Sequence, residues 1–442
     1  MDTPIFDFVQ NYIKSNTARL HMPGHKGVSF LGCEAFDITE IKGADELYSP
    51  EGIIRQSEEN ATHLFDTAKT IYSAGGSSQS INAMLYLAYL KADKSTRPFV
   101  LAGRNAHKSF IYALGKLDAD VKWLCPQNSD SICSCILNGN IVENKLQALE
   151  GKPFAVYITS PDYLGGISDI PSISMVCKKY DIPLLVDNAH GSYLKFCPQD
   201  MHPISLGADM CCDSAHKTLP VLTGGGYLHI AKDDKYGFSQ NAINAMAIFG
   251  STSPSYLILQ SLDLCNKYVD EKIKSDIEIC AEKVAELRSF INSKGFGVVS
   301  CEPLKLTIDF RGFDFDFAEY LRDNNIEFEY ADKDFVVFMF SPQNSDSDFE
   351  KVKSAFANLN LKKTKEVKNI EFPFAERTMT IREAIFSECE EIKVEKALNR
   401  VCANPTVSCP PAIPIAVSGE KITESHIELF KKYNVGKIQV VK

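Results

Sequence analysis

Short apolar runs alternate with helical patterns through the middle of the chain. The runs lie at residues 98–103, 120–126, 154–161, 182–191, 208–216 and 225–231. Each has the length of a strand, and their apolar character is typical of strands buried on both faces. Helical stretches separate several of them, for example residues 107–117 and 172–181. The alternation predicts an α/β fold with a mostly parallel central sheet covered by helices.

The regions on either side of these runs have different patterns. The first fifty or so residues are rich in turn formers and predict an extended arm. Residues 58–72 then predict a helix that leads into a short strand, and residues 80–93 predict an apolar helix with Ile81, Met84, Leu85, Ala88 and Tyr89 at helical spacing. Residues 255–295 predict one or two long helices.

The remaining pattern divides the chain into four parts. Strand-like runs at 304–310, 326–332 and 334–340 surround a helix at 316–324 and predict a small α+β domain. After a polar linker at 361–369, residues 380–401, a Pro-rich stretch and a final helix and strand form a third segment. We therefore predict an N-terminal arm (1–57), a large α/β domain (58–265), a small α+β domain (266–362) and a C-terminal domain (363–442).

Composition narrows the class of protein. The 442 residues are 45% hydrophobic and 24% charged, which is typical of a globular protein with a large core. The net charge of -10 argues against broad nucleic-acid binding. The 14 cysteines include no zinc-type CxxC pair, so no metal site is expected. Neither a signal-peptide pattern nor an apolar run of about eighteen residues is visible, which indicates a reduced, cytoplasmic protein without a membrane partner.

Candidate chemistry lies at the ends of the predicted strands. Gly75, Gly76, Ser77 and Ser78 fall between a strand and a helix. Backbone N–H groups at a helix N-terminus, with two hydroxyls beside them, suit a phosphate group. The alternative is an ordinary N-cap formed by one of the serines.

An aspartate and a lysine follow two later strands. Asp187 ends the run "LLVD". Three interpretations are open for an aspartate at this place: a metal ligand, a helix cap, or the partner of a cationic ring nitrogen. Lys217 follows the run that ends in "DSAHK", and a lysine amine can condense with an aldehyde to form a Schiff base. A phosphate site, a strand-end aspartate and a later lysine, in that order, together fit pyridoxal 5'-phosphate.

Several motifs resemble one enzyme family. "HMPGHKG" (21–27), "RNAHKS" (104–109), "VDNAHG" (186–191), "DSAHKTLP" (213–220) and "TSPSYL" (252–257) are similar to motifs of the Orn/Lys/Arg decarboxylases, which have the aspartate-aminotransferase fold, fold type I. "PPAIPIAVSGEKIT" (410–423) resembles the signature of that family's C-terminal domain. The resemblance runs nearly end to end and is closest to the short members, which lack an N-terminal wing domain.

The resemblance implies a role for each matching residue. Lys217 would bind the cofactor covalently, Asp187 would pair with its ring nitrogen, and His107 would stack on the ring. His216 either contacts the phosphate or transfers protons beside Lys217. The remaining expected cofactor contacts are Gly76, Ser77, Ser78 and Ser214 around the phosphate, and His190 in the turn beneath the ring.

Five positions depart from the family pattern. They are Asp162 in place of threonine, Asn188 in place of glutamate, Tyr193 in place of a frequent histidine, Gly224 in place of glutamine and Cys409 in place of tyrosine. The first, second and fourth are expected near the cofactor. They leave Lys217, Asp187 and His107 in place but put the substrate, and the level of activity, in question.

The implied reaction is α-decarboxylation of a basic amino acid to the corresponding polyamine-type amine, with arginine as the first expectation and lysine or ornithine next. Asp45, Glu46 and Asp162 are candidates to bind the distal cation of the substrate, although an exposed charged face is the simpler role for each. A homodimer or higher homo-oligomer with shared active sites is also implied. The alternatives are an aminotransferase or another lyase on the same fold, and a non-catalytic homologue.

Overall fold

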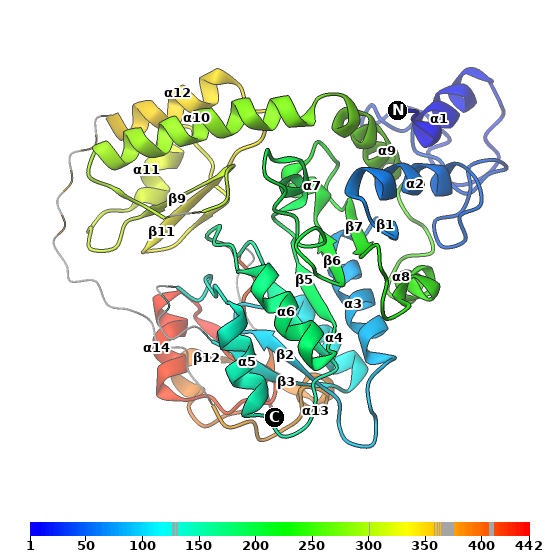
Figure 1. Ribbon diagram of the computed structural model, residues 1–442. Coiled ribbons are helices and arrows are strands. Elements are labelled where there is room, and N and C mark those ends of the chain that lie inside the picture. Colours follow the sequence, from blue (N-terminus) through cyan, green and yellow to red (C-terminus); the bar gives the residue numbers. More distant parts are fainter. Residues whose placement is uncertain are drawn as a thin grey trace. The chain divides into compact units, whose positions relative to one another are not determined.

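Every apolar run of the central region forms a strand in the computed structural model (Figure 1). The strands are β2 (Phe99–Gly103), β3 (Asp120–Leu124), β4 (Ala155–Thr159), β5 (Leu184–Asp187), β6 (Met210–Asp213) and β7 (Gly226–Ile230). β5 runs parallel to β6, and β2 runs parallel to both β3 and β4. β7 is antiparallel to its two neighbours, β6 and β1 (Lys69–Ser73). The predicted α/β fold with mostly parallel central strands is therefore confirmed.

The structure describes residues 1–125, 129, 131–299, 301–357, 359, 361, 363, 375–405 and 411–442. The predicted linker at 361–369 and Cys409 lie largely or wholly outside these residues. The described chain folds into two units, one made of Met1–Lys91 and Pro183–Asp276, the other of Ala92–Ile182 and Ile277–Lys442. The four domain boundaries proposed above stay a prediction.

The first unit has the strand order β1-β7-β6-β5. α3 (Gly76–Tyr89) packs against these strands and buries Ile81, Met84, Leu85 and Ala88, as its apolar spacing predicts, whereas Tyr89 is only partly buried. The other helical elements are α2 (Ile53–Phe65), η1 (Ser192–Phe196), α7 (Ala215–Thr218), η2 (Phe238–Gln240), α8 (Ala242–Ile248) and α9 (Tyr256–Glu271). Most of α3 is buried, which gives the loop that precedes it a rigid support.

The N-terminal arm is not wholly extended. The prediction is wrong for α1 (Pro4–Lys14), an amphipathic helix with proline at its first position and with Ile5 and Val9 fully buried. The prediction of an extended arm rested on the turn formers of residues 21–52, and the short helical pattern of α1 was overlooked. The Asp263 carboxylate in α9 accepts the backbone N–H groups of Ile5 (2.9 Å) and Phe6 (3.0 Å) and so ties the start of α1 to the unit.

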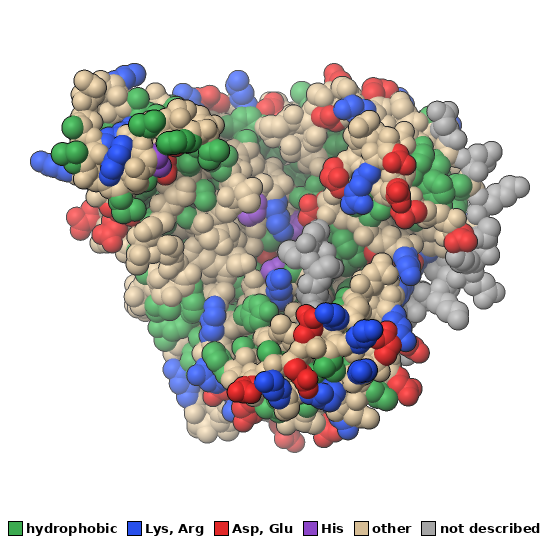
Figure 2. Space-filling view, turned by 180° about the vertical axis from the view of Figure 1, so that it is seen from behind, with side chains coloured by type: hydrophobic (Ala, Val, Ile, Leu, Met, Phe, Trp, Pro, Cys, Tyr) green, Lys and Arg blue, Asp and Glu red, His purple; other side chains and the backbone are tan. Residues whose placement is uncertain are grey.

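The arm beyond α1 exposes large apolar side chains. Leu20 and Leu31 are about nine-tenths exposed, at 92% and 90%. Met22, Val28 and Phe30 are more than half exposed. The hydrophobic side chains on the N-terminal segment are visible at the upper left of Figure 2. A surface of this kind is typical of a segment that packs against another protein chain.

The second unit contains the order β4-β2-β3 and two smaller sheets. The smaller sheets have the orders β10-β11-β9-β8 and β12-β14-β13. Their strands are β8 (Gly297–Val298), β9 (Lys305–Asp309), β10 (Tyr330–Ala331), β11 (Phe335–Met339), β12 (Cys389–Lys393), β13 (Cys402–Asn404) and β14 (Lys437–Val441). The helical elements are α4 (Lys108–Leu117), α5 (Gly139–Gln147), α6 (Ile170–Tyr180), α11 (Phe317–Asp323), α12 (Asp346–Ala357), α13 (Ile381–Phe386), η3 (Val394–Lys396) and α14 (Glu424–Lys432).

The long helical stretch forms two helices, α9 and α10 (Ile273–Ser293), which confirms one of the two expectations for it. α10 begins at the end of the first unit and continues into the second. One hydrophobic cluster of the second unit includes Tyr330 and Val337 of the four-stranded sheet together with Ile413, Ile422 and Ile438 of the C-terminal segment. The small sheet and the C-terminal segment therefore share part of their core.

Candidate active site

Asp187 and Lys217 lie at one edge of the first unit's strands. Asp187 is the last residue of β5 and pairs in parallel register with Cys212 of β6. β6 ends one residue later, and Lys217 follows in the single turn of α7. The carboxyl ends of parallel strands are where ligands bind in folds of this type. The structure therefore places Asp187 and Lys217 at the carboxyl ends of β5 and β6, as the sequence predicts.

Lys217 contacts His190, which belongs to the turn after β5. The Nζ atom of Lys217 lies 2.9 Å from Nε2 of His190, and the lysine backbone N–H donates to the carbonyl of Ser214 (2.9 Å). His190 is buried and Lys217 is half-buried. The amine is therefore held in one place at the site edge while it stays partly accessible.

Asp187 is buried, with only 2% of its surface exposed. Its Oδ1 atom accepts the backbone N–H of Ala189 (3.2 Å) and lies 3.6 Å from the thiol of Cys212. A buried carboxylate is costly unless a cation or hydrogen-bond donors compensate it. A protonated ring nitrogen would supply such a charge, so the position fits the predicted pairing with the cofactor.

The predicted phosphate site lies at the start of α3. The helix begins at Gly76, and its N-cap residue, Gly75, offers no side-chain oxygen to the first turn. The hydroxyl of Ser214 donates to that of Ser77 at 2.8 Å, so two hydroxyl groups meet at this helix end. Helix dipole and hydroxyls together suit an anion, and the residues present fit a phosphate group.

Glycines allow neighbouring backbone segments to approach the N-terminus of α3 closely. A Cβ atom on Gly226 would lie 2.7 Å from the carbonyl oxygen of Asp213 and 3.4 Å from the backbone nitrogen of Ser77. Gly76 has a φ of +63° and Gly224 a φ of +100°, and the N–H of Gly76 donates to the carbonyl of Gly224 at 2.7 Å. Glutamine at position 224 would be strained in this left-handed conformation, which explains the glycine found there.

We expect Gly226→Ala to destabilise the fold by about 1–3 kcal/mol, because the new methyl group meets backbone rather than a movable side chain. Urea unfolding followed by circular dichroism measures this change. Gly436→Ala is the matched control, since a Cβ atom at Gly436 would have no heavy atom within 4 Å. Equal stability of the two variants would contradict the close approach described here.

His216 follows Ser214 in α7 and faces the glycine tract. Its Nδ1 atom lies 2.8 Å from the carbonyl oxygen of Gly225, which can only accept, so Nδ1 carries the proton. Burial, and secondarily the charge of Lys217, lowers the pKa of His216. The ring is thus neutral at pH 7, with Nε2 available to accept a proton. Both of its predicted roles stay open.

His107 lies in the second unit, at the N-cap of α4. Its Nδ1 atom accepts the backbone N–H of Ser109 (3.1 Å). The local geometry thus assigns it a capping role, and its stacking on the cofactor ring stays a prediction. In the same unit the neighbouring Arg104, only 1% exposed, donates to the carbonyls of Pro414 and Ile415 at 2.7 Å each.

These contacts join two motifs that the sequence pattern left separate. The N–H of Lys108 also donates to the carbonyl of Ala412 (2.9 Å), so "RNAHKS" binds the Pro-rich stretch of the C-terminal segment at three points. Arg104 is not among the residues predicted above to have a functional role. The signal in the sequence was an arginine three residues before His107, but its partners are 310 and 311 positions away and leave no local pattern.

Two of the other departures from the family pattern are built into the core. The Nδ2 atom of Asn188 donates to Oδ1 of Asp213 at 2.7 Å, and Tyr193 is only 1% exposed. Asn188 therefore ties the turn after β5 to the end of β6. A glutamate at this position would place a second carboxylate against Asp213.

The proposed carboxylates for a distal cation differ in their surroundings. Asp45 accepts backbone N–H groups of Glu51 (2.9 Å), Gly52 (2.8 Å) and Ile54 (3.0 Å), and thereby organises the start of α2. Burial opposes ionisation of Asp45, but the backbone hydrogen bonds prevail and lower its pKa. Glu46 is exposed.

Asp162 is buried in the second unit. It accepts the hydroxyl of Ser134 and the N–H of Gly166, each at 2.8 Å. Burial raises the pKa of this carboxyl. Both Asp45 and Asp162 thus already stabilise their own loops.

Within the residues that the structure describes, no helix combines the length and apolar character needed to cross a membrane.

Comparisons with known proteins place these features in context. The family model described as Orn/Lys/Arg decarboxylase, major domain, matches residues 3–311, and the one described as Orn/Lys/Arg decarboxylase, C-terminal domain, matches residues 363–435. Arginine decarboxylase of Bacillus subtilis is 28% identical over 98% of this chain and 94% of its own length. Arginine decarboxylase of Bacillus anthracis is 28% identical over 98% of this chain and 93% of its own.

Solved structures share the fold at lower identity. The constitutive lysine decarboxylase of E. coli superposes with a TM-score of 0.78 at 18% identity, covering 100% of this chain and 82% of the other. Serine palmitoyltransferase of Sphingomonas wittichii gives a TM-score of 0.57 at 12% identity, covering 80% and 83%. The predicted fold type I architecture is thereby confirmed.

Proposed function

The chain belongs to the Orn/Lys/Arg decarboxylase family and is a pyridoxal-phosphate-dependent amino-acid decarboxylase, and we propose that it converts arginine to agmatine and carbon dioxide. Lysine is the second candidate and ornithine the third. The observation that carries the proposal is the joint placement of Lys217, Asp187 and the Ser77–Ser214 pair at one edge of the first unit. The names of the relatives at 28% identity favour arginine over lysine.

Each site residue has a distinct task in this proposal. Pyridoxal phosphate, when bound, supplies an acceptor for the electron pair released as the carboxylate leaves. Lys217 holds the cofactor covalently, and Asp187 keeps its ring nitrogen protonated. Gly76, Ser77, Ser78 and Ser214 bind the phosphate, and His190 positions the ring. Stacking of His107 on the ring stays a prediction from the family resemblance.

A proton must then be delivered to Cα of the substrate. Lys217 and His216 are the adjacent candidates, because both lie on the turn of α7. The proton on Nδ1 of His216 is held by Gly225, so His216 would act through Nε2. A phosphate contact of His216 is the alternative, and it would leave proton delivery to Lys217.

We also propose that the protein acts as a homo-oligomer, at least a dimer. The exposed apolar residues of the N-terminal arm, Leu20, Phe30 and Leu31 among them, support a protein contact at that surface. Asp263 binds the start of the N-terminal arm, so the exposed apolar part of the arm follows a segment that is held in place.

An aminotransferase is the alternative that the reaction test must exclude. A carboxylate clamp near the C-terminal segment would need an available arginine. Arg377 pairs with Asp120, and Arg382 donates to the carbonyls of Gly115 and Lys116 at 3.2 Å each. These partners favour structural roles for both arginines.

The test supplies arginine, lysine and ornithine separately in heavy water with pyridoxal phosphate. We expect carbon dioxide from arginine and one deuterium at Cα of agmatine, because protonation there completes a decarboxylation. Mass spectrometry of the amine and manometry of the gas measure both. Cadaverine as the main product would show that the substrate is lysine, and putrescine would show that it is ornithine. A keto acid without carbon dioxide would indicate an aminotransferase, and no product from any of the three would favour a different substrate or a non-catalytic homologue.

A further inference from the structure

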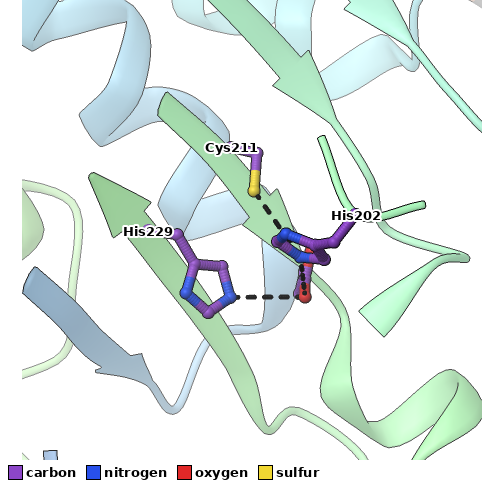
Figure 3. Close-up of side chains that lie close together, drawn as sticks. His202, Cys211 and His229 are labelled. Atoms are coloured by element: carbon purple, nitrogen blue, oxygen red, sulfur yellow. Dashed lines mark hydrogen bonds and ion pairs between the residues drawn. The ribbon is translucent and has the colours of Figure 1, made fainter. Parts of the chain in front are cut away.

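Four metal-ligating side chains that have no role in the proposed cofactor site gather in the core of the first unit. They are His202, Cys211, Asp213 and His229, and one ligand atom of each lies within 4.8 Å of all the others. All four side chains are fully buried. Figure 3 shows the two imidazole rings and the thiol turned toward one another.

Secondary structure brings these residues together. Cys211 and Asp213 are two apart on β6 and therefore face the same side of the strand. His229 on β7 is the direct cross-strand partner of Cys211. His202 comes from the segment between η1 and β6.

Three of the six distances between the ligand atoms are close to those of tetrahedral coordination, and all six are within 4.8 Å. Nε2 of His202 and Nε2 of His229 lie 3.1 Å and 3.3 Å from Oδ2 of Asp213, and Sγ of Cys211 lies 3.9 Å from Nε2 of His202. Ligands about 2.0–2.3 Å from a tetrahedral zinc ion lie roughly 3.3–3.7 Å from one another. Shifts of a few tenths of an ångström would bring these three contacts to that range.

We propose that His202, Cys211, Asp213 and His229 form a structural zinc site. Two imidazoles, a thiolate and a carboxylate are a donor set that suits Zn²⁺, and four protein ligands leave no open position for catalysis. The thiolate and the carboxylate carry two negative charges that the ion neutralises, so the buried site has no net charge. For Nε2 of His202 and of His229 to bind the ion, the proton of each neutral imidazole moves to Nδ1. Binding also releases the thiol proton of Cys211 to solvent, and no electron is transferred.

Outer contacts already orient two of the ligands. The hydroxyl of Thr70 lies 2.9 Å from Nδ1 of His229, and Asn188 donates to Oδ1 of Asp213 at 2.7 Å, which leaves Oδ2 toward the imidazoles. Partners of this kind fix ligand orientation in metal sites. Because Asp213 immediately precedes Ser214, an ion here would hold the end of β6 and the turn that carries Lys217.

The proposal is tested on the full-length protein made in zinc-supplemented medium and purified without chelator. The site is closed to solvent, so the ion is expected to enter during folding. We expect native mass spectrometry and elemental analysis to find about one zinc per chain. X-ray absorption at the zinc edge should show one sulfur at about 2.3 Å and nitrogen or oxygen ligands at about 2.0 Å.

Two variants separate this site from metal bound elsewhere. Cys211→Ala should lose the bound zinc, whereas Cys177→Ala, which removes another buried thiol in α6 of the second unit, should retain it. If Cys211→Ala fails to fold, the X-ray absorption spectrum of the unaltered protein still tests whether a sulfur atom binds the zinc. Zinc without a sulfur ligand, or no zinc in the purified protein, would overturn the proposal and leave a hydrogen-bonded cluster centred on Asp213.

Discussion

Lys217→Ala is expected to abolish covalent attachment of the cofactor and to lower decarboxylation by at least about 10³-fold, as removal of other covalent catalytic groups does. The amine of Lys217 lies beside His190 in the first unit, at the edge that Asp187 also occupies. Without that amine, pyridoxal phosphate would be held only by the proposed contacts to its phosphate and ring. Borohydride reduction followed by peptide mass spectrometry should mark Lys217 in the unaltered protein and no lysine in the variant.

Lys217→Arg and Lys195→Ala complete this experiment. Arginine keeps the positive charge but forms no stable link to an aldehyde, so Lys217→Arg should be as inactive as the alanine variant. Lys195 lies in the same unit and pairs with Asp200 at 2.9 Å, so its replacement should leave both labelling and turnover unchanged. A reduced adduct on any other lysine, or substantial turnover in Lys217→Arg, would show that the assignment is wrong.

The second large effect is expected for Asp187→Asn. The variant keeps the size of the side chain but removes the negative charge proposed to keep the cofactor's ring nitrogen protonated. We expect decarboxylation to fall by about 10²–10³-fold, the usual effect of removing one electrostatic stabiliser of a transition state. The cofactor content should change little, since Lys217 and the Ser77–Ser214 pair remain. Steady-state kinetics with parallel measurement of bound cofactor provide both values.

Asp187→Glu serves as the conservative comparison. It retains the negative charge, although its longer side chain must fit in the space beside Cys212. Partial recovery of turnover relative to Asp187→Asn is expected. Near-normal turnover of the asparagine variant would mean that Asp187 has only a structural role, with its carboxylate serving to accept the N–H of Ala189.

The sequence was most informative where function depends on local order. The places of the central strands, the apolar spacing of α3, and the positions of Asp187 at the end of β5 and of Lys217 after β6 all follow from patterns of a few residues. The family resemblance rested on motifs of the same length. The structure confirmed these strands and helices and brought Lys217 against His190.

Features that depend on distant partners were missed. The helix α1 has few residues to show its periodicity, and its anchor, Asp263, lies far along the chain. Arg104 binds carbonyls of the C-terminal segment. The proposed zinc ligands show no CxxC spacing because adjacent strands and a loop, rather than one short motif, bring His202 and His229 to β6.

The pairing of β1 with β7 also has a consequence for how the chain matures on the ribosome. Ser73 of β1 pairs with Gly226 of β7. Residues 92–182, which belong to the second unit, are synthesised between these two strands. Such distant pairing makes loop closure costly and slows folding. The helix end proposed to bind the cofactor's phosphate cannot be completed until the chain has emerged beyond Gly226. Cofactor capture is therefore a late event in biogenesis, and a nascent chain stalled before that point would leave β1 without its partner strand and open to aggregation.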